Sequence, residues 1–537
     1  MRRESQSSAK PGVPADSARK PKVPKKKEAA YLSNPLYDRL LAPYAEDNRL
    51  LIERPDGSRL SYAETIGLSG RLANALAALG AAAGDRIAVQ VEKSPEALAV
   101  YFAAVRLGAV FLPLNTAYTP AEVGYFVADA QPKVLLCDSA KAGDLRAIAA
   151  KVPAQLATMD RDGGGSLTAA AATAPTAFET MARRPDDLAA ILYTSGTTGR
   201  SKGAMLTQEN LLSNALTLTA LWRFTAADVL LHVLPIFHTH GLFVATNVVL
   251  AAGGAMIFLP KFELEGVLAA LPRATAMMGV PTFYTRLLAS EAFTGETTAR
   301  MRLFTSGSAP LPAETHVAFE ARTGHRILER YGMTETNMST SNPYCGARKA
   351  GTVGLPLPDV DLRIVDLASG ASVAQGEVGV IEVKGPNVFK GYWRMPEKTR
   401  EGFRPDGYFI SGDLARRDED GYVAIVGRAR DLIISGGFNV YPKEVEEVLD
   451  ALPGVLESAV VGIPHPDFGE GVVAFVVPEK GAAPAEEALI AALAQKLARF
   501  KQPKRIFFLE ALPRNAMGKV QKNQLRKAKA DLFRSQL

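Results

Sequence analysis

The sequence predicts an α/β protein of at least two domains. Short apolar runs alternate with helix-length segments from Asn34 to about Pro185, which is the rhythm of a parallel sheet covered by helices. The same alternation returns on a smaller scale near the C-terminus. The 537 residues are too many for one ordinary core, and 47% hydrophobic residues are enough to fill several.

The first third of the chain predicts alternating helices and strands. We expect a helix over Tyr62–Leu79 capped by Ser61, a strand over Arg86–Val91, a helix over Pro95–Leu107 and a strand over Pro132–Cys137. Residues 154–185 are rich in Ala and carry little apolar periodicity. We therefore expect them to form a peripheral excursion.

A loop suited to phosphate follows the apolar run 188–192, which predicts a buried strand. The loop offers Thr194, Ser195, Gly196, Thr197, Thr198, Gly199 and Lys202. Glycines let backbone N–H groups approach phosphate oxygens, hydroxyls add donors, and a cation offsets the charge. The Walker A spacing is absent, so an ordinary P-loop is disfavoured, and a plain surface loop is the alternative.

The middle of the chain predicts further strands and turns that carry polar groups. After a strand over residues 203–206, Thr207 caps a helix over 208–221, and a strand over 301–305 leads into a turn. That turn, Ser306–Gly307–Ser308, and the motif 331–336 are expected where parallel strands end, which is where ligands bind α/β sheets. His238 and His240 would share one face of a strand, either as metal ligands or as core histidines.

The C-terminal segment predicts a small α/β domain. We expect helices over 444–451 and 485–497 and strands over 455–461, 471–478 and 505–508. Before it, Asp413 at a predicted strand end and Arg428 could bind ribose or phosphate. Near its end, Lys519 follows a glycine that frees the backbone to project the side chain from a loop tip.

These motifs together resemble those of the adenylate-forming enzymes, the superfamily of acyl-CoA synthetases, luciferases and adenylation domains, along nearly the whole chain after residue 31. The resemblance implies a large N-terminal domain over 31–429, a mobile C-terminal domain over 430–537 that turns about Arg430, and the substrates ATP and CoA with Mg²⁺. The roles that it implies are Tyr331 and Gly332 at adenine, Thr334 and Thr194 at phosphate, Glu335 as the Mg²⁺ ligand, Asp413 and Arg428 at ribose, His238 at the acyl group, Lys519 as the catalytic lysine, and Gly436 and Gly437 at the pantetheine channel.

The acid is indicated by the segment Val280–Arg286, which resembles that of malonyl-CoA and methylmalonyl-CoA synthetases. There the arginine, here Arg286, binds the distal carboxylate, and Thr239 and Met338 would close a small pocket. An arginine on an amphipathic helix can equally lie at the surface. The resemblance therefore implies a dicarboxylate substrate, with a short- or medium-chain fatty acid, or a carrier-protein thiol in place of CoA, as alternatives.

The charge of the chain is concentrated in its first 30 residues, which hold nine of the 62 cations and three of the 56 anions. The remaining residues are therefore neutral, with 53 of each. We expect residues 1–30 to be a disordered tail, and a scaffold that binds nucleic acid through this tail is the nonenzymatic alternative. Two distant cysteines, no membrane-length apolar run and no secretory start favour a cytoplasmic enzyme. Nothing in the sequence indicates the oligomeric state.

Overall fold

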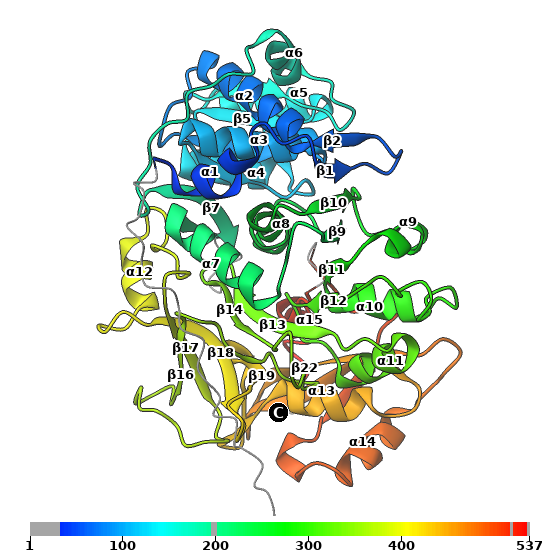
Figure 1. Cartoon of the computed structure of the whole chain (residues 1–537). Coiled ribbons are helices and arrows are strands. Elements are labelled where there is room, and N and C mark those ends of the chain that lie inside the picture. Colours follow the sequence, from blue (N-terminus) through cyan, green and yellow to red (C-terminus); the bar gives the residue numbers. More distant parts are fainter. Residues whose placement is uncertain (1–32, 195–200, 516–518, 534–537) are drawn as a thin grey trace, which may run out of the picture. The chain divides into compact units, whose positions relative to one another are not determined.

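The computed structural model describes residues 33–194, 201–515 and 519–533. Residues 33–537 cluster as one compact unit, and the described part of it contains four β-sheets surrounded by helices (Figure 1). The expected alternation of helices and strands is confirmed. No helix of the described part is long and apolar enough to cross a membrane.

The first sheet has six strands in the order β6-β5-β3-β4-β7-β8. Their bounds are β3 Arg86–Gln90, β4 Val110–Pro113, β5 Val134–Cys137, β6 Gln155–Thr158, β7 Leu188–Thr194 and β8 Lys202–Thr207. All neighbours are parallel except β7 and β8. The excursion expected over 154–185 is wrong in part, because β6 extends this sheet and a helix follows it.

The second sheet has nine strands in the order β15-β14-β13-β12-β11-β9-β10-β1-β2. They are β1 Leu50–Glu53, β2 Arg59–Ser61, β9 Val229–His232, β10 Ala255–Phe258, β11 Ala276–Gly279, β12 Leu303–Ser306, β13 Leu328–Met333, β14 Asn337–Ser341 and β15 Leu355–Pro356. Its central strands are parallel, whereas β14 and β15 pair antiparallel at one edge.

Helices connect and cover these two sheets. They are α1 Pro35–Leu40, α2 Tyr62–Ala78, α3 Pro95–Leu107, α4 Pro120–Ala130, α5 Ala142–Ala149, α6 Ser166–Thr173, α7 Gln208–Leu221, α8 Asn247–Ala252, α9 Leu264–Ala270, α10 Pro281–Leu288 and α11 Ala313–Thr323. The predicted Ser61 and Thr207 caps are present as capping boxes. Every residue of α3 except Glu96 is buried, as expected for a helix that is apolar on all sides.

The third sheet is antiparallel, in the order β16-β17-β18-β19. Its strands are β16 Asp361–Val365, β17 Gly379–Lys384, β18 Phe409–Arg417 and β19 Val423–Arg428, and α12 covers Pro396–Gly402. Asp413 lies in the middle of β18, paired with Arg428, rather than at a strand end. That expectation is wrong because β18 continues past a register shift at Leu414/Ala415.

The fourth sheet contains only strands that follow Asp431. They are β20 Ile433–Ser435, β21 Phe438–Val440, β22 Val455–His465, β23 Gly469–Pro478 and β24 Arg505–Phe508, with helices α13 Pro442–Asp450, α14 Glu486–Ala494 and α15 Lys522–Ala528. The predicted elements of this region are therefore present, although β22 is longer than expected. A hydrophobic core of its own, which includes Val445, Val472 and Leu493, holds this sheet to its helices.

Candidate active site

The turn after β12 is where the candidate site begins. Ser306 ends β12, and Ser308 has a φ of 70°, a left-handed conformation that is uncommon for a residue with a side chain. A Cβ on Gly307 would lie 2.1 Å from Nη1 of Arg330, so only glycine lets the turn pass this guanidinium. The predicted turn therefore lies against the neighbouring strand β13.

Asp413 and Arg428, which we expect at ribose, form one cluster with Tyr331, which we expect at adenine. Nε of Arg428 lies 2.6 Å from Oδ1 of Asp413, and the Tyr331 hydroxyl donates to Oδ2 at 2.5 Å. Asp413 is buried, and its charge raises the pKa of the Arg428 guanidinium. Burial and the same carboxylate raise the pKa of Tyr331, so its hydroxyl is a donor.

Glu335, the expected metal ligand, lies beyond β13 and is buried. Its Oε1 accepts hydrogen bonds from the Tyr392 hydroxyl at 3.0 Å and from Thr194 Oγ1 at 3.5 Å. Lys202 lies 4.1 Å from the centre of the Tyr392 ring, and burial lowers the pKa of this lysine while Glu335 opposes the shift. Thr194, Lys202 and Glu335 are therefore neighbours, as the sequence predicted.

Glu335 is a single carboxylate. A single carboxylate suits an Mg²⁺ ion that is bound together with substrate phosphates, and not an ion that only protein side chains coordinate. Within the described ranges no three His, Cys, Asp or Glu side chains are grouped to hold a metal. Mg²⁺ is typically bound through one or two carboxylates plus substrate phosphates, so Glu335 fits that ion. The alternative of a His238–His240 metal site is wrong for the described residues.

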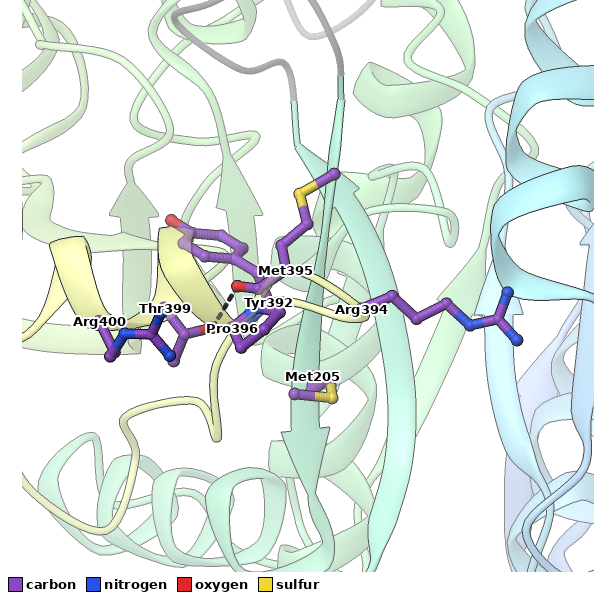
Figure 2. Close-up of a pocket in the computed structure, with 7 residues that line it drawn as sticks. All are labelled: Met205, Tyr392, Arg394, Met395, Pro396, Thr399 and Arg400. Carbon is purple, nitrogen blue, oxygen red and sulfur yellow. Dashed lines mark hydrogen bonds between the residues drawn. The ribbon is translucent and has the colours of Figure 1, made fainter.

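A pocket of about 450 Å³ has Tyr392 in its lining (Figure 2), and the hydroxyl of this residue donates to Glu335. Figure 2 shows the residues that line it: Met205, Tyr392, Arg394, Met395, Pro396, Thr399 and Arg400. Arg394 is engaged elsewhere, by the carbonyl of Asp129 and the side chain of Gln131. The backbone N–H of Tyr392 donates to Thr399 at 2.9 Å, which holds the ring that backs Lys202.

Lys519 is brought to the same cluster from the C-terminal region. Its backbone N–H donates to Asn515 Oδ1 at 3.0 Å, and the residue keeps contact with solvent. The surrounding protein atoms and Arg428 lower the pKa of its ammonium, while Asp413 and Glu335 oppose that shift. The lysine is thus close enough to sense the charges of the candidate nucleotide site.

His238 is a neutral hydrogen-bond donor. Burial, with Lys519 and Arg330 nearby, lowers its pKa to about 3. Its Nδ1 accepts the backbone N–H of His240 at 3.2 Å, so the hydrogen of the neutral ring is on Nε2. His238 can therefore donate to a carboxylate without titrating near neutral pH.

His240 belongs to a π-helix, His240–Thr246, rather than to a strand. Its Nδ1 lies 3.2 Å from Ser308 Oγ, and its Nε2 is buried without a partner among the described residues. Burial and Arg330 lower its pKa, so this ring is neutral too. His240 therefore lies against the turn after β12 through Ser308.

Arg330 is the functional candidate that sequence reasoning missed. It is only 2% exposed, and in the described structure its Nε and Nη2 have no hydrogen-bond partner. Burial lowers its pKa to about 9, so the guanidinium is charged at neutral pH. Ser306 Oγ and His240 Nε2 are also buried without a hydrogen-bond partner among the described residues, so each calls for an explanation.

Of the residues expected around the acid besides His238, two are buried and one is exposed. Thr239 is buried and donates to Asn337 Oδ1 at 3.0 Å, and Met338 is buried at the start of β14. Arg286 is exposed on α10, the surface alternative, although α10 begins at the end of β11 beside Ser306. The burial of Arg330 follows from the strands that pair with β13 on both sides, and no pattern in the sequence signals it.

The remaining predicted residues lie in turns. Thr334 is half-buried after β13, and Arg430 lies in a 3-10 turn, Ala429–Asp431, between the third and fourth sheets. Gly436 and Gly437, with φ of 60° and 83°, connect β20 to β21. Ser195, Gly196, Thr197, Thr198 and Gly199 of the phosphate loop lie outside the described residues.

Comparison with solved structures shows the same fold. MatB from Rhodopseudomonas palustris with ATP bound is 59% identical, and the match covers 93% of this chain and 99% of that one with a TM-score of 0.91. The structure of the apo form of the same protein matches with a TM-score of 0.80, at the same identity and coverage. The described structure therefore resembles the ATP-bound form more than the apo form, in agreement with Lys519 lying near Asp413.

Curated relatives are CoA ligases of several acids. A malonate–CoA ligase from Arabidopsis thaliana is 38% identical over 485 residues, which is 84% of this chain and 79% of the relative. A feruloyl-CoA synthase from an Amycolatopsis species is also 38% identical, over 482 residues covering 88% of this chain and 95% of the relative. Equal identity to ligases of different acids means that the pocket must decide the acid.

The family comparison covers both parts of the chain. Residues 42–393 match the family of AMP-binding enzymes, and residues 444–519 match the C-terminal domain of the same family. The matched segments contain the Glu335 and Lys519 motifs that the sequence singled out. With its sheets, its site geometry and these matches in agreement, the chain belongs to the AMP-binding enzyme family, and its fold is the adenylate-forming fold.

Proposed function

We propose that this protein is an ATP-dependent malonate–CoA ligase that also accepts methylmalonate. It would join the acid to CoA through an acyl-adenylate and release AMP and pyrophosphate. The unpartnered Arg330 guanidinium is the observation that carries the proposal, since it is a buried positive charge beside His238, which we propose to contact the acyl group. The malonate–CoA ligase among the relatives supports the same acid.

The nucleotide would be held by the cluster around Asp413. Asp413 would accept the ribose hydroxyls, with Arg428 and Tyr331 fixing its two oxygens. Thr334, Thr194 and the loop 195–202 would hold the phosphates, and Glu335 would hold Mg²⁺, which offsets phosphate charge when bound. Lys519 would donate to the α-phosphoryl oxygens as negative charge develops there.

The acid would react without a general base, because a carboxylate is already ionised at neutral pH. One oxygen of the acid would attack the α-phosphorus, and pyrophosphate would leave. His238 would donate from Nε2 to this carboxylate and orient it. Thr239 and Met338 would limit the room beyond the second carboxylate, which favours short acids.

Arg330 would hold the distal carboxylate. Burying a guanidinium without a partner is unfavourable, so a ligand that supplies a carboxylate gains what the protein itself lacks. An acid without that group would leave the charge unpaired, and we expect a difference of about 2–4 kcal/mol. Arg286 stays in the proposal as a second cation, one and a half helical turns into α10.

The thiol step would need a different arrangement of the C-terminal region. We propose domains over 31–429 and 430–537 that turn about Arg430, so that Lys519 leaves and the Gly436–Gly437 turn shapes a pantetheine channel. The thiol of CoA would then displace AMP. A cytoplasmic location fits these substrates and stays a prediction.

The test is a panel of acids with ATP, Mg²⁺ and CoA, following AMP release from wild type and from the variants Arg330→Met and Arg286→Met. We expect malonate, then methylmalonate, to be preferred over acetate, butyrate and octanoate. Arg330→Met should lower kcat/KM for malonate about 30–1,000-fold and leave acetate nearly unchanged. Better turnover of octanoate than malonate by the wild type would refute the assignment.

The matched pair of variants separates the two arginines and controls for folding. Replacing an unpartnered buried charge by an apolar side chain should keep or raise the melting temperature of Arg330→Met. If only Arg286→Met loses the preference for malonate, then Arg286 on α10, and not Arg330, binds the distal carboxylate. A carrier-protein acceptor would show as AMP release that free CoA does not stimulate.

A further inference from the structure

The backbone of Met338 lies where the second sheet is incomplete. β14 pairs with β13 on one side, where Gly332 is opposite Met338. On its other side, β15 reaches only Thr340 and Ser341. The peptide groups of Met338 that point away from β13 therefore have no strand to pair with, and buried peptide groups require partners.

The side chain of Asn214 takes the place of that missing strand. Its Oδ1 accepts the Met338 N–H at 3.2 Å, and its Nδ2 donates to the Met338 carbonyl at 2.9 Å. Asn214 is 4% exposed and projects from α7. A primary amide copies the donor and acceptor of a peptide group, so this pair of bonds fixes the position of Met338 along the strand.

Asn337, which precedes Met338, is also held by several hydrogen bonds. Asn337 has a φ of 48°, and its Nδ2 lies within 3.4 Å of the Asn210 carbonyl and 3.3 Å of the Asn387 carbonyl. Asn387 in turn donates to the Met338 carbonyl at 3.1 Å. The Thr239 hydroxyl completes the set through Asn337 Oδ1.

The Met338 side chain has little freedom to move toward β13. A Cβ on Gly332 would lie 2.7 Å from the Met338 methyl carbon, so the side chain already packs directly on the backbone there. Its depth in the pocket is therefore set by the position of its own backbone, which the asparagines hold. A shift of the backbone by a fraction of an ångström would carry the methyl group with it.

We propose that Asn214, with Asn337 beside it, is a positioning residue that sets the length of acid the enzyme accepts, by fixing the backbone of Met338. This inference rests on the proposed function, because it takes Met338 as the wall of the acid pocket. Asn214 acts through Met338 and does not touch the acid.

The test compares malonate with glutarate, a longer dicarboxylate. Both acids carry a second carboxylate, so the ratio of their kcat/KM values reports the wall and not the charge on Arg330. In Asn214→Ala we expect the ratio of malonate to glutarate to fall at least tenfold, mostly through a lower KM for glutarate. Asn214→Asp keeps the acceptor and loses the donor, and should give a smaller fall.

A double-mutant cycle with Met338→Ala decides whether Asn214 acts through the wall. Met338→Ala should lower the same ratio, and adding Asn214→Ala should then lower it no further. Additive effects would overturn the inference. Asn74→Ala is the matched control, because that amide also donates to backbone carbonyls, those of Gly70, Pro175 and Ala177, and should leave the ratio unchanged.

The outcomes separate this inference from the proposed function. If the wild type shows no preference for malonate over acetate, the proposed function fails. If that preference holds and Asn214→Ala slows malonate and glutarate equally, the asparagine has only a structural role and the inference fails alone. Asn214→Gln keeps the amide on a longer side chain. If this variant restores the ratio of malonate to glutarate, the hydrogen bonds of the amide, and not its volume, position Met338.

Discussion

The nucleotide half and the acid half of the site differ in how their charges are balanced. In the nucleotide half Asp413 faces Arg428 and Tyr331, and Glu335 accepts from Tyr392. In the proposed acid half Arg330, His240 and Ser306 have buried polar atoms with no hydrogen-bond partner among the described residues. The polar groups of the first half are partnered within the protein, whereas we propose that those of the second are partnered by the acid.

The difference teaches where each half obtains its selectivity. A partnered cluster is ordered before its ligand arrives, which favours affinity. An unpartnered cluster rejects any acid that leaves it unsatisfied, because the penalty falls on the wrong ligand. In the proposed function the first half therefore serves the adenylation step, and the second selects the acid.

The largest effect is expected from Lys519→Ala, which should break the nucleotide half. In the proposed mechanism the lysine stabilises charge on the α-phosphoryl group, so its loss should slow adenylation about 10²–10³-fold, measured by ATP–pyrophosphate exchange. Thioester formation from supplied malonyl-adenylate should remain largely intact. Equal loss of both half-reactions would contradict the domain alternation.

Asp413→Asn should weaken the nucleotide half without touching the acid half. Hydrogen bonds to a charged group contribute about 1.5–3 kcal/mol, so KM for ATP should rise about 10–100-fold. The ratio of malonate to glutarate turnover should stay as in the wild type, since neither Arg330 nor Met338 contacts this residue. A change in that ratio would show that the two halves are coupled.

Glu329→Gln should change how the stability of the protein depends on pH, because Glu329 is a buried carboxyl next to Arg330. Burial raises the pKa of Glu329 to about 7, while its Leu311 N–H bond, Lys443 and Arg330 oppose the shift. A raised folded pKa stabilises the protein fully below the unfolded value of 4.5, and this contribution is lost as pH rises through 7. Wild type should therefore lose up to about 3 kcal/mol relative to Glu329→Gln between pH 4.5 and 8.

Thermal unfolding of both proteins across that pH range measures the difference. The two melting temperatures should draw apart in favour of the glutamine variant between pH 4.5 and 7 and stay separated above pH 7. Curves that stay parallel would mean that Glu329 is ionised throughout, paired with Lys443 or Arg330.

The smallest effect is expected from removing residues 1–30. The basic tail lies outside both halves of the site as proposed, so kcat and KM for ATP and malonate should be unchanged within error. Salt-sensitive binding of nucleic acid that is lost on truncation would give the tail a separate role. A raised KM for ATP would instead place it in the nucleotide half.

The parts of the site that the sequence predicted are those carried by contiguous motifs. Glu335, Tyr331 and Asp413 were singled out because their motifs resemble those of the adenylate-forming enzymes. The midstrand position of Asp413 could not be foreseen, since a register shift leaves no mark in residue type. The four-residue strand β6 was missed for a similar reason, because an Ala-rich stretch lacks periodicity.

Arg330 and the asparagines were missed because burial of a polar residue is a property of the whole fold. Glu329 and Arg330 directly precede the motif 331–336, and from the sequence alone they would be expected in solvent, because arginine and glutamate are rarely buried. Only the pairing of β13 with strands on both sides places them in the interior. Asn214 likewise looks like an ordinary helix residue until β14 is seen to lack a neighbour.

The π-helix His240–Thr246 makes the site depend on chain length as well as on residue type. A π-helix accommodates one residue more than an α-helix of the same height. Deleting a single buried residue such as Val244 would restore the ordinary helical phase and turn the preceding backbone by about 100°. His240 would then lose its contact with Ser308, although every side chain of the candidate site would still be encoded, so insertions and deletions here are as consequential as substitutions.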